Sequence, residues 1–335
     1  MLPPFAPESY VDFNMPGPRE QMLAALKQVR GELGRSYPLW IDGSPVTPGP
    51  TFKSTSPADP SRLVGEVAMA DAALADRAVH AAAERFREWS RWDPDARARI
   101  LIKAAAFMRR RVYELSAWMC YEVSKTWIEA YADTCEAIDF MEFYGREMMS
   151  LKGAHPVTPY PGEENEIRYI PLGVGVVIPP WNFPLAICTG MTTAALVTGN
   201  TVVLKPASTS PVIAAKLVEI LHEAGLPRWA LNFVPGPGGT VGDTMVSHPK
   251  TRFISFTGSR DVGLGIFEKA AKVHPGQIWL KRTVLEMGGK DCILVDETAD
   301  LDAAAGGVVA SAFGFQGQKC SACSRLIVHE AVHAN

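Results

Sequence analysis

The sequence predicts an α/β fold built on a doubly wound parallel sheet, a variant of the Rossmann arrangement. After Pro171, apolar strand-like runs alternate with helical runs, and repeated βα units of this kind form a parallel sheet covered by helices on both faces. Turns rich in glycine and proline follow the predicted strands, which is where such sheets bind their ligands. The length of 335 residues makes two domains plausible.

The N-terminal part predicts an arm followed by helices. Residues 1–70 are rich in proline and contain one short β element at about residues 39–46. Residues 72–150 have Ala-rich amphipathic patterns, with a helix start at Asp93-Pro94. A run of arginines is interpreted as a solvated helix face in preference to a binding patch, and it comprises Arg97, Arg99, Arg109, Arg110 and Arg111.

The segment 151–171 predicts a β-hairpin, because turn residues lead into an alternating stretch at 166–170. An exposed strand of this kind adds readily to another sheet, so the hairpin is a candidate subunit contact. The βα region that follows places strands at 175–178, 201–204, 230–234 and 252–256, with helices at 186–197, 212–224, 240–247 and 261–273.

The composition argues against a nucleic-acid-binding, secreted or membrane protein. The net charge of −3 gives no basic field for nucleic acid or an anionic membrane surface. Residues 1–18 lack the regions of a signal peptide, and no apolar run is long enough to span a bilayer. The six cysteines are scattered as in a reducing compartment, so we expect a cytoplasmic protein.

Cys320 is the candidate nucleophile. It ends the glycine-rich stretch 313–320 and directly follows Lys319. A thiol reacts as the thiolate, which a nearby cation favours. An inert buried cysteine is the alternative interpretation, and the loop around Cys320 argues against it.

Asn182 and Glu286 complete the groups that covalent acyl chemistry on a carbonyl requires. Asn182 lies in a turn that prolines rigidify, and a fixed amide donor suits a developing oxyanion. Its alternative is a turn former or helix N-cap. Glu286 precedes glycine-containing backbone, so its carboxylate could move to activate a thiol or a water. Its alternative is a salt-bridged surface residue.

Three turns are candidates for cofactor contacts. Lys205 follows the second strand, where a lysine can meet a ribose hydroxyl or a phosphate, although a surface lysine is the alternative. Glycine-rich turns at 235–242 and 256–263 follow the next two strands and would let backbone approach a cofactor. Neither turn is the G-x-G-x-x-G fingerprint, so a dinucleotide would be held in a variant manner. Glycine as turn punctuation is the alternative.

The pair Cys320 and Cys323 has the C-x-x-C spacing, which permits a thioredoxin-like or metal interpretation. A second pair and a histidine at ligand spacing are both missing, so we expect no zinc and no other metal. A thioredoxin motif should also lie early in a small βαβ domain, which this pair does not.

Together these motifs resemble the aldehyde dehydrogenase superfamily. Five motifs carry the resemblance in order and spacing over about residues 38–329, namely Pro-Trp-Asn-Phe-Pro at 180–184, Lys-Pro at 205–206, Phe-Thr-Gly-Ser-x-x-x-Gly at 256–263, Glu-x-Gly-Gly-Lys at 286–290 and Gly-Gln-Lys-Cys at 317–320. Longer strings at 276–282, 295–300 and 315–322 are similar to one branch, the L-glutamate γ-semialdehyde (1-pyrroline-5-carboxylate) dehydrogenases. That branch performs the second step of proline breakdown to glutamate.

The resemblance implies NAD-dependent oxidation of an aldehyde. Cys320 would attack the aldehyde to give a thiohemiacetal, and Asn182 with the Cys320 backbone N–H would bind its oxyanion. Glu286 would activate the water that releases glutamate from the resulting thioester. The implied cofactor residues are Ile178, Pro179, Pro180, Trp181, Lys205, Ala207, Ser208, Gly238, Gly242, Phe256, Thr257, Gly258, Ser259, Val262, Met287 and Gly288.

The branch also implies a substrate pocket and departures from the usual pattern. Glu136, Phe183 and Ser321 would line the aldehyde pocket, with Ser321 bonded to the substrate carboxylate. Many relatives have Glu where Ser208 stands, and that Glu repels a 2′-phosphate, so NADP is possible beside NAD. Cys323 replaces a small residue, and a reversible disulfide with Cys320 is a hypothesis.

The resemblance implies a domain organisation. Residues 1–154 would be an N-terminal arm and the helical part of the cofactor domain, 155–171 a hairpin of the oligomerisation region, 172–285 the NAD-binding α/β domain, and 286–335 the start of an incomplete α/β catalytic domain. The chain would then be shortened at its carboxyl end and expose apolar surface, while the full-length protein would be a homo-oligomer. A dehydrogenase for another semialdehyde, a nucleotide-binding module without catalysis and a thiol–disulfide protein are the alternatives.

Overall fold

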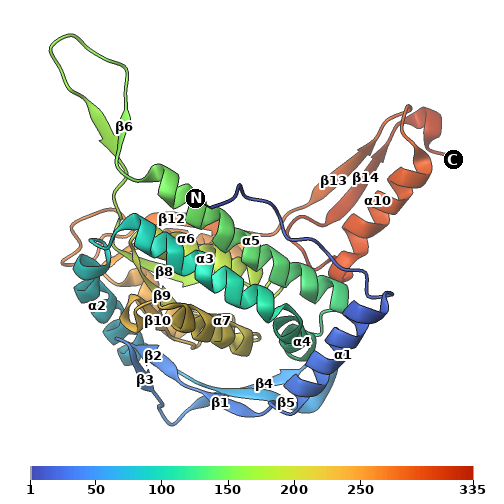
Figure 1. Ribbon diagram of the computed structural model, residues 1–335, viewed down its shortest axis with the longest axis horizontal. Coiled ribbons are helices and arrows are strands. Elements are labelled where there is room, and N and C mark those ends of the chain that lie inside the picture. Colours follow the sequence, from blue (N-terminus) through green and yellow to red (C-terminus); the bar gives the residue numbers. More distant parts are fainter. Residues whose placement is uncertain (1, 335) are drawn as a thin grey trace.

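The computed structural model describes residues 2–334 and is organised around one seven-stranded sheet (Figure 1). The five strands from β12 to β10 are parallel, and β2 and β3 extend the sheet as an antiparallel hairpin. In spatial order the strands are β12 (Arg282–Glu286), β11 (Thr251–Thr257), β8 (Val174–Ile178), β9 (Thr201–Leu204), β10 (Leu231–Phe233), β2 (Leu39–Ile41) and β3 (Ser44–Val46).

The central strands form because their residues are apolar on both faces. All four residues of β9 are buried, as are the first four of β8. Alternate side chains of these strands enter two separate cores, with Val177 and Val202 in one and Val176 and Val203 in the other. A strand buried on both faces is typical of a parallel sheet between two helical layers.

Helices cover the two faces as the doubly wound prediction requires. On one face lie α6 (Ala186–Val197) and α7 (Pro211–Ala224), with α3 (Pro94–Arg110), α4 (Val112–Val123) and α5 (Trp127–Leu151) packed outside them. On the other face lie α2 (Ala72–Trp89), α8 (Asp243–Ser247) and α9 (Arg260–Ala271). The bounds of β9 and α6 agree with the sequence prediction to the residue, and the other βα elements agree within about three residues.

The N-terminal segment contains more structure than the predicted arm. The helix α1 (Pro16–Arg30) has proline in its first turn, where a missing N–H costs no hydrogen bond. A separate three-stranded sheet follows, ordered β1 (Arg35–Tyr37), β5 (Asp59–Ala68) and β4 (Thr51–Ser56). The prediction of a mostly irregular arm, which rested on the prolines of this segment, is therefore wrong.

The arginine run is not uniformly a solvated face. Arg97 is only 3% exposed, and its guanidinium donates to the carbonyl oxygens of Val197 and Trp92. Val197 is the last residue of α6, where carbonyls lack an intrahelical partner, and Trp92 lies in the turn between α2 and α3. Arg99 and Arg110 are exposed, as predicted. The interpretation is therefore wrong for Arg97, because tertiary packing buries it between two helices.

Two parts of the chain project from the body (Figure 1). One is the predicted hairpin, formed by β6 (Ala154–Pro156) and β7 (Glu166–Arg168), which carries the exposed Ile167 and Ile170. The other contains β13 (Asp291–Val295) paired in parallel with β14 (Cys323–Val328), together with α10 (Leu301–Phe313). Within residues 2–334, no helix is long and apolar enough to cross a membrane.

Candidate active site

The sheet has a switch point between β8 and β11. From β8 the chain adds β9 and β10 on one side, then returns to add β11 and β12 on the other. In such sheets a crevice opens beyond the carboxyl ends of the two strands where the order reverses. A cavity of about 610 Å³ lies at this place, bordered by Ile178 at the end of β8 and by Thr257 at the end of β11.

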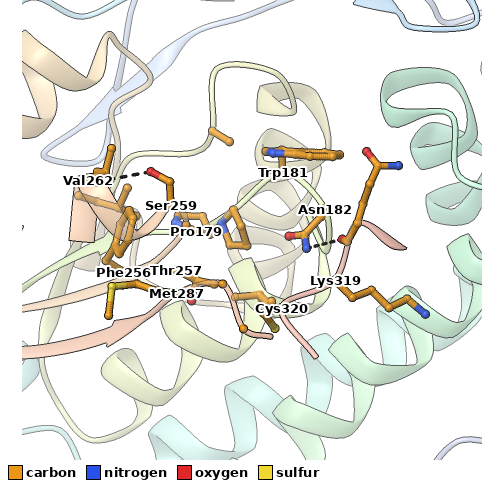
Figure 2. A pocket seen from close by; sticks show the side chains of 18 of the residues that line it. Pro179, Trp181, Asn182, Phe256, Thr257, Ser259, Val262, Met287, Lys319 and Cys320 are labelled. Carbon is orange, nitrogen blue, oxygen red and sulfur yellow. Dashed lines mark hydrogen bonds between the residues drawn. The ribbon is translucent and has the colours of Figure 1, made fainter. Parts of the chain in front are cut away.

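Cys320 and Asn182 meet in this cavity (Figure 2). The Asn182 side-chain N–H donates to the carbonyl oxygen of Gln318 at 2.8 Å, and its oxygen accepts the N–H of Phe183 at 3.1 Å. These bonds fix the amide beside the loop that carries the exposed Cys320. A second N–H on the same amide nitrogen is available to an acceptor near the thiol.

The nucleophile loop has an unusual backbone. Phe315 and Gln316 have φ values of 47° and 55°, followed by Gly317 at 68°. Consecutive non-glycine residues in the left-handed region cost free energy and require support from surrounding contacts. Lys319 contributes one tether, since its ammonium lies 3.6 Å from the carboxylate of Glu129 on α5.

Glu286 lines a different cavity from Asn182. It is the last residue of β12, at the edge of the sheet, and its side chain is exposed. It borders a second cavity of about 500 Å³, which runs along α6 and is walled mainly by apolar residues such as Phe140 and Met191. Cys320 lines both cavities, so the thiol stands where they adjoin.

A third cavity, of about 450 Å³, adjoins the first at Ile178 and Val262. Lys205 reaches it from the carboxyl end of β9 and is 5% exposed. Its ammonium donates to the Pro206 carbonyl oxygen at 3.2 Å. Burial lowers the pKa of Lys205 to about 8. A desolvated cation with few acceptors favours a ligand that presents oxygen atoms.

The first and third cavities collect nearly all the candidate cofactor residues. The first is lined by Ile178, Pro179, Pro180, Trp181, Ala207, Phe256, Thr257, Gly258, Ser259, Val262, Met287 and Gly288, and the third by Lys205, Gly238 and Gly242 among others. Gly258 and Gly263 matter sterically, because a Cβ there would come within 2.5 Å of the Phe256 ring and 2.7 Å of the Met287 sulfur. Ser208 is exposed and lies outside both cavities.

The candidate substrate residues lie around these cavities without lining them. Glu136 is exposed on α5, and burial of its surroundings followed by the charge of Asp133 raises its pKa. Phe183 is half-buried and directly follows Asn182, and Ser321 is exposed and directly follows Cys320. Their role in binding an aldehyde stays a prediction.

The sequence interpretation missed several residues of the site. Ile187, Gly289, Gln318 and Lys319 line the first cavity. The last three lie inside motifs that the sequence identified, although no role was predicted for them as site residues. Lys125 and Asp133 also lie behind the site as a buried ion pair. Lys125 lies in the short connection before α5, where a lysine is usually exposed. The sequence therefore gives no sign of its burial, and only the packing identifies the pair.

Away from these cavities, Asp76, His80 and His248 come within ligand distance of one another. The Nδ1 atom of His80 faces the Lys250 ammonium at 2.8 Å, and the Nδ1 atom of His248 accepts the Lys250 backbone N–H at 3.0 Å. A neutral imidazole whose Nδ1 accepts a bond carries its proton on Nε2, the atom that faces Asp76. The cluster is thus arranged for hydrogen bonding, with a nearby cation that disfavours a metal ion.

Comparison with known proteins identifies relatives of this chain. The profile of the aldehyde dehydrogenase family matches residues 44–335. The 1-pyrroline-5-carboxylate dehydrogenase of Geobacillus kaustophilus is 60% identical over 333 residues, which cover 99% of this chain and 65% of that protein. A Bacillus cereus protein of the same name is 56% identical with the same coverage.

Solved structures agree with the sequence comparison. A 1-pyrroline-5-carboxylate dehydrogenase from Thermus with bound NAD superposes with a TM-score of 0.96 at 51% identity, covering 99% of this chain and 64% of that chain. The present chain spans about 65% of the length of the curated relatives it matches. Its fold, the order of its motifs and the matched profile lead to one conclusion: the chain belongs to the aldehyde dehydrogenase family.

Proposed function

We propose that this chain carries the cofactor site and the nucleophile of an NAD-dependent L-glutamate γ-semialdehyde dehydrogenase, an oxidoreductase of proline breakdown. The observation that carries the proposal is that Cys320 lines two cavities, the first of which also contains Asn182 and the second Glu286. A thiol so placed can meet an aldehyde while a hydride acceptor occupies the neighbouring cavity.

The residues of the first and third cavities fit a dinucleotide. The buried Lys205 offers an ammonium to ribose hydroxyls, and Gly238 and Gly242 leave backbone open to close approach. The relative from Thermus was solved with bound NAD. When bound, the nicotinamide accepts the hydride that leaves the carbonyl carbon. Serine at 208 adds no carboxylate against a 2′-phosphate, so the proposal includes NADP.

The proposed chemistry divides among three side chains. The Cys320 thiolate adds to the aldehyde carbon and forms a C–S bond, while the carbonyl oxygen becomes an oxyanion that the Asn182 N–H stabilises. Loss of hydride from the same carbon leaves a thioester. Glu286 then takes a proton from water, whose oxygen attacks the thioester, and the thiolate leaves as the carboxylate product forms.

The proposed substrate and setting follow the curated relatives. They are 1-pyrroline-5-carboxylate dehydrogenases, whose name identifies the cyclic form of glutamate γ-semialdehyde. Glu136, Phe183 and Ser321 would contact this aldehyde, and Ser321 would donate to its carboxylate. We propose a cytoplasmic homo-oligomer, with the exposed β6–β7 hairpin as a contact. Another semialdehyde is the second candidate, because the second cavity is mainly apolar.

A chimera tests the function. This chain replaces the matching part of the Geobacillus kaustophilus relative, and NADH formation is followed with glutamate γ-semialdehyde. We expect turnover by the chimera, loss of at least roughly 10³-fold in Cys320→Ala, and roughly 10²-fold lower kcat in Asn182→Ala. Turnover only with a different aldehyde would reject the substrate, and a chimera that binds NAD without oxidising any aldehyde would favour a nucleotide-binding role.

A further inference from the structure

Lys125 lies behind the candidate site in a fully enclosed position. It occupies the short connection between α4 and α5, and its side chain has no exposure to solvent. The ammonium lies 2.6 Å from a carboxylate oxygen of Asp133, whose side chain is also fully buried. Burial of a cation carries a large desolvation cost. The groups that contact the Lys125 ammonium therefore indicate its role.

The same ammonium lies between two aromatic rings. It is 4.2 Å from the ring centre of Phe183 and 4.6 Å from that of Phe315. A desolvated ammonium is attracted to both ring faces. Phe183 directly follows Asn182, and Phe315 belongs to the loop that leads to Cys320. One cation therefore contacts the oxyanion turn and the nucleophile loop together.

Asp133 adds a second connection to the oxyanion turn. Its other carboxylate oxygen accepts the backbone N–H of Ala186 at 2.6 Å, at the first residue of α6. The turn that holds Asn182 is thus tied at Phe183 through the ammonium and at Ala186 through the carboxylate. A negative charge at a helix N-terminus is itself favourable.

The nucleophile loop needs such a support. Phe315 has a φ of 47° and is 5% exposed, and Gln316 next to it also has a positive φ. Each such residue costs roughly 1–3 kcal/mol and persists only where neighbouring contacts determine it. The Phe315 ring makes its charged contact with Lys125, so the ammonium opposes relaxation of the loop.

We propose that Lys125 is a positioning residue, which with Asp133 holds Phe183 and Phe315 so that the Asn182 amide faces the Cys320 thiol. This inference rests on the proposed function for its effect on catalysis. It concerns geometry, since a buried ion pair by itself is weak support for stability and could be replaced by apolar side chains at little cost.

The first test measures turnover in the chimera. Phe315→Leu leaves the ion pair intact and removes one ring, while Lys125→Met removes the cation. We expect kcat to fall roughly tenfold and roughly 10²-fold respectively, with KM for NAD changed less than about threefold, because misplacement of about 1 Å costs that much in rate. The kcat of the double variant should be at most about twofold below that of Lys125→Met, since both substitutions release the same nucleophile loop.

The second test is independent of any activity. Hydrogen exchange of the hydrogen-bonded amides of Ala186 and Gln318 is measured in this chain. We expect roughly tenfold faster exchange at both in Lys125→Met, and at Gln318 in Phe315→Leu, with α3 unchanged. Lys103→Met is the matched control, because Lys103 is exposed and lies 5.4 Å above the Phe107 ring, away from both loops.

The outcomes separate the two proposals. Unchanged exchange at both amides together with unchanged kcat in Phe315→Leu and Lys125→Met would overturn the positioning role, even if thermal stability fell. A chimera that oxidises no aldehyde, while the variants still release both loops, would reject the proposed function and retain the positioning. If Lys125→Met does not fold, Phe315→Leu alone decides between these outcomes.

Discussion

Lys205 shows how the environment of one residue governs ligand binding. Its ammonium is buried at the carboxyl end of β9, and that burial lowers its pKa from the ordinary value to about 8. The unfolded chain binds a proton there up to about pH 10.4. Between these values the unfolded state binds more protons, so the free energy of unfolding should rise with pH by at most about 3 kcal/mol.

NAD affinity should show the opposite dependence on pH. If the ammonium donates to ribose oxygens, affinity is highest below about pH 8 and falls by up to roughly tenfold for each pH unit above it. Calorimetric titration with NAD from pH 7 to pH 9.5 measures the slope. Lys205→Met should bind more weakly and lose the slope, whereas a slope retained in that variant would assign the titration to another group.

Arg97 lines none of the cavities described above, yet we predict that its substitution has a large effect on the free energy of unfolding. Its guanidinium donates to the Val197 carbonyl at 2.9 Å, at the last residue of α6. Arg97→Met would leave buried carbonyls without a donor, and we expect a loss of about 3 kcal/mol in the free energy of unfolding. Urea denaturation measures it. Arg99→Met, on the exposed side of the same helix, should change stability by less than about 0.5 kcal/mol.

At the scale of elements, the N-terminus of α7 is capped by a residue distant in sequence. The Glu122 carboxylate on α4 accepts the N–H groups of Val212 and Ile213, each at 2.8 Å, and the hydroxyl of Ser54 at 2.9 Å. The adjacent Ser210 provides no side-chain cap. Glu122 therefore joins β4, α4 and α7, and α7 begins just after the loop that carries the cofactor candidates.

Loss of this cap should destabilise the fold, although Glu122 lines none of the three cavities described above. Glu122→Ala leaves two buried N–H groups unpaired, and we expect about 3 kcal/mol of destabilisation. Thermal and urea unfolding measure this change, with the exposed Glu84→Gln on α2 as the control. A cost below about 1 kcal/mol would show that water or another group replaces the carboxylate.

Periodicity predicts some elements well and fails on others for physical reasons. The strand β9 and the helix α6 are buried on nearly every side, so their apolar runs end where the elements end. The helix α1 and the strands β4 and β5 escaped prediction because prolines and polar residues occupy the exposed positions of marginally buried elements. Tertiary contacts that the sequence does not display stabilise them.

At the scale of the whole molecule, the candidate site was predictable where its chemistry lies in contiguous motifs. Asn182 lies in the turn after β8, Glu286 ends β12, and Cys320 lies in the loop between α10 and β14. The parallel order of the sheet brings the ends of β8 and β12 to one edge, where the Cys320 loop also lines the cavities. The Lys125–Asp133 pair was not predictable, because its role arises from burial between elements. Ser208 was predicted from the resemblance to border the cofactor, where many relatives have Glu, yet it is exposed and lines neither the first nor the third cavity.

The projecting unit of β13, β14 and α10 should be the least stable part of the described chain. None of the residues of α10 is buried, and Val309 and Phe313 are 58% and 71% exposed. The paired strands β13 and β14 form only a two-stranded parallel ladder, which is marginal without a covered face. Burial of apolar surface supplies most of the stability of a helix, and α10 lacks it.

Hydrogen exchange monitored by mass spectrometry tests this difference in stability. Amides of α10 should exchange at least roughly a hundredfold faster than those of α6, which contacts both β8 and β9. Cys320 lies between α10 and β14 and lines the first cavity with Gln318 and Lys319, so faster opening of this unit would move the nucleophile and one wall of that cavity, while the walls formed by β8 and β11 stay in place. Equal protection in α10 and α6 would contradict this, because it requires a buried face that residues 2–334 do not provide for α10. Opening should therefore change the reactivity of the thiol more than the cofactor affinity, since most cofactor candidates belong to the sheet and the turns that follow its strands.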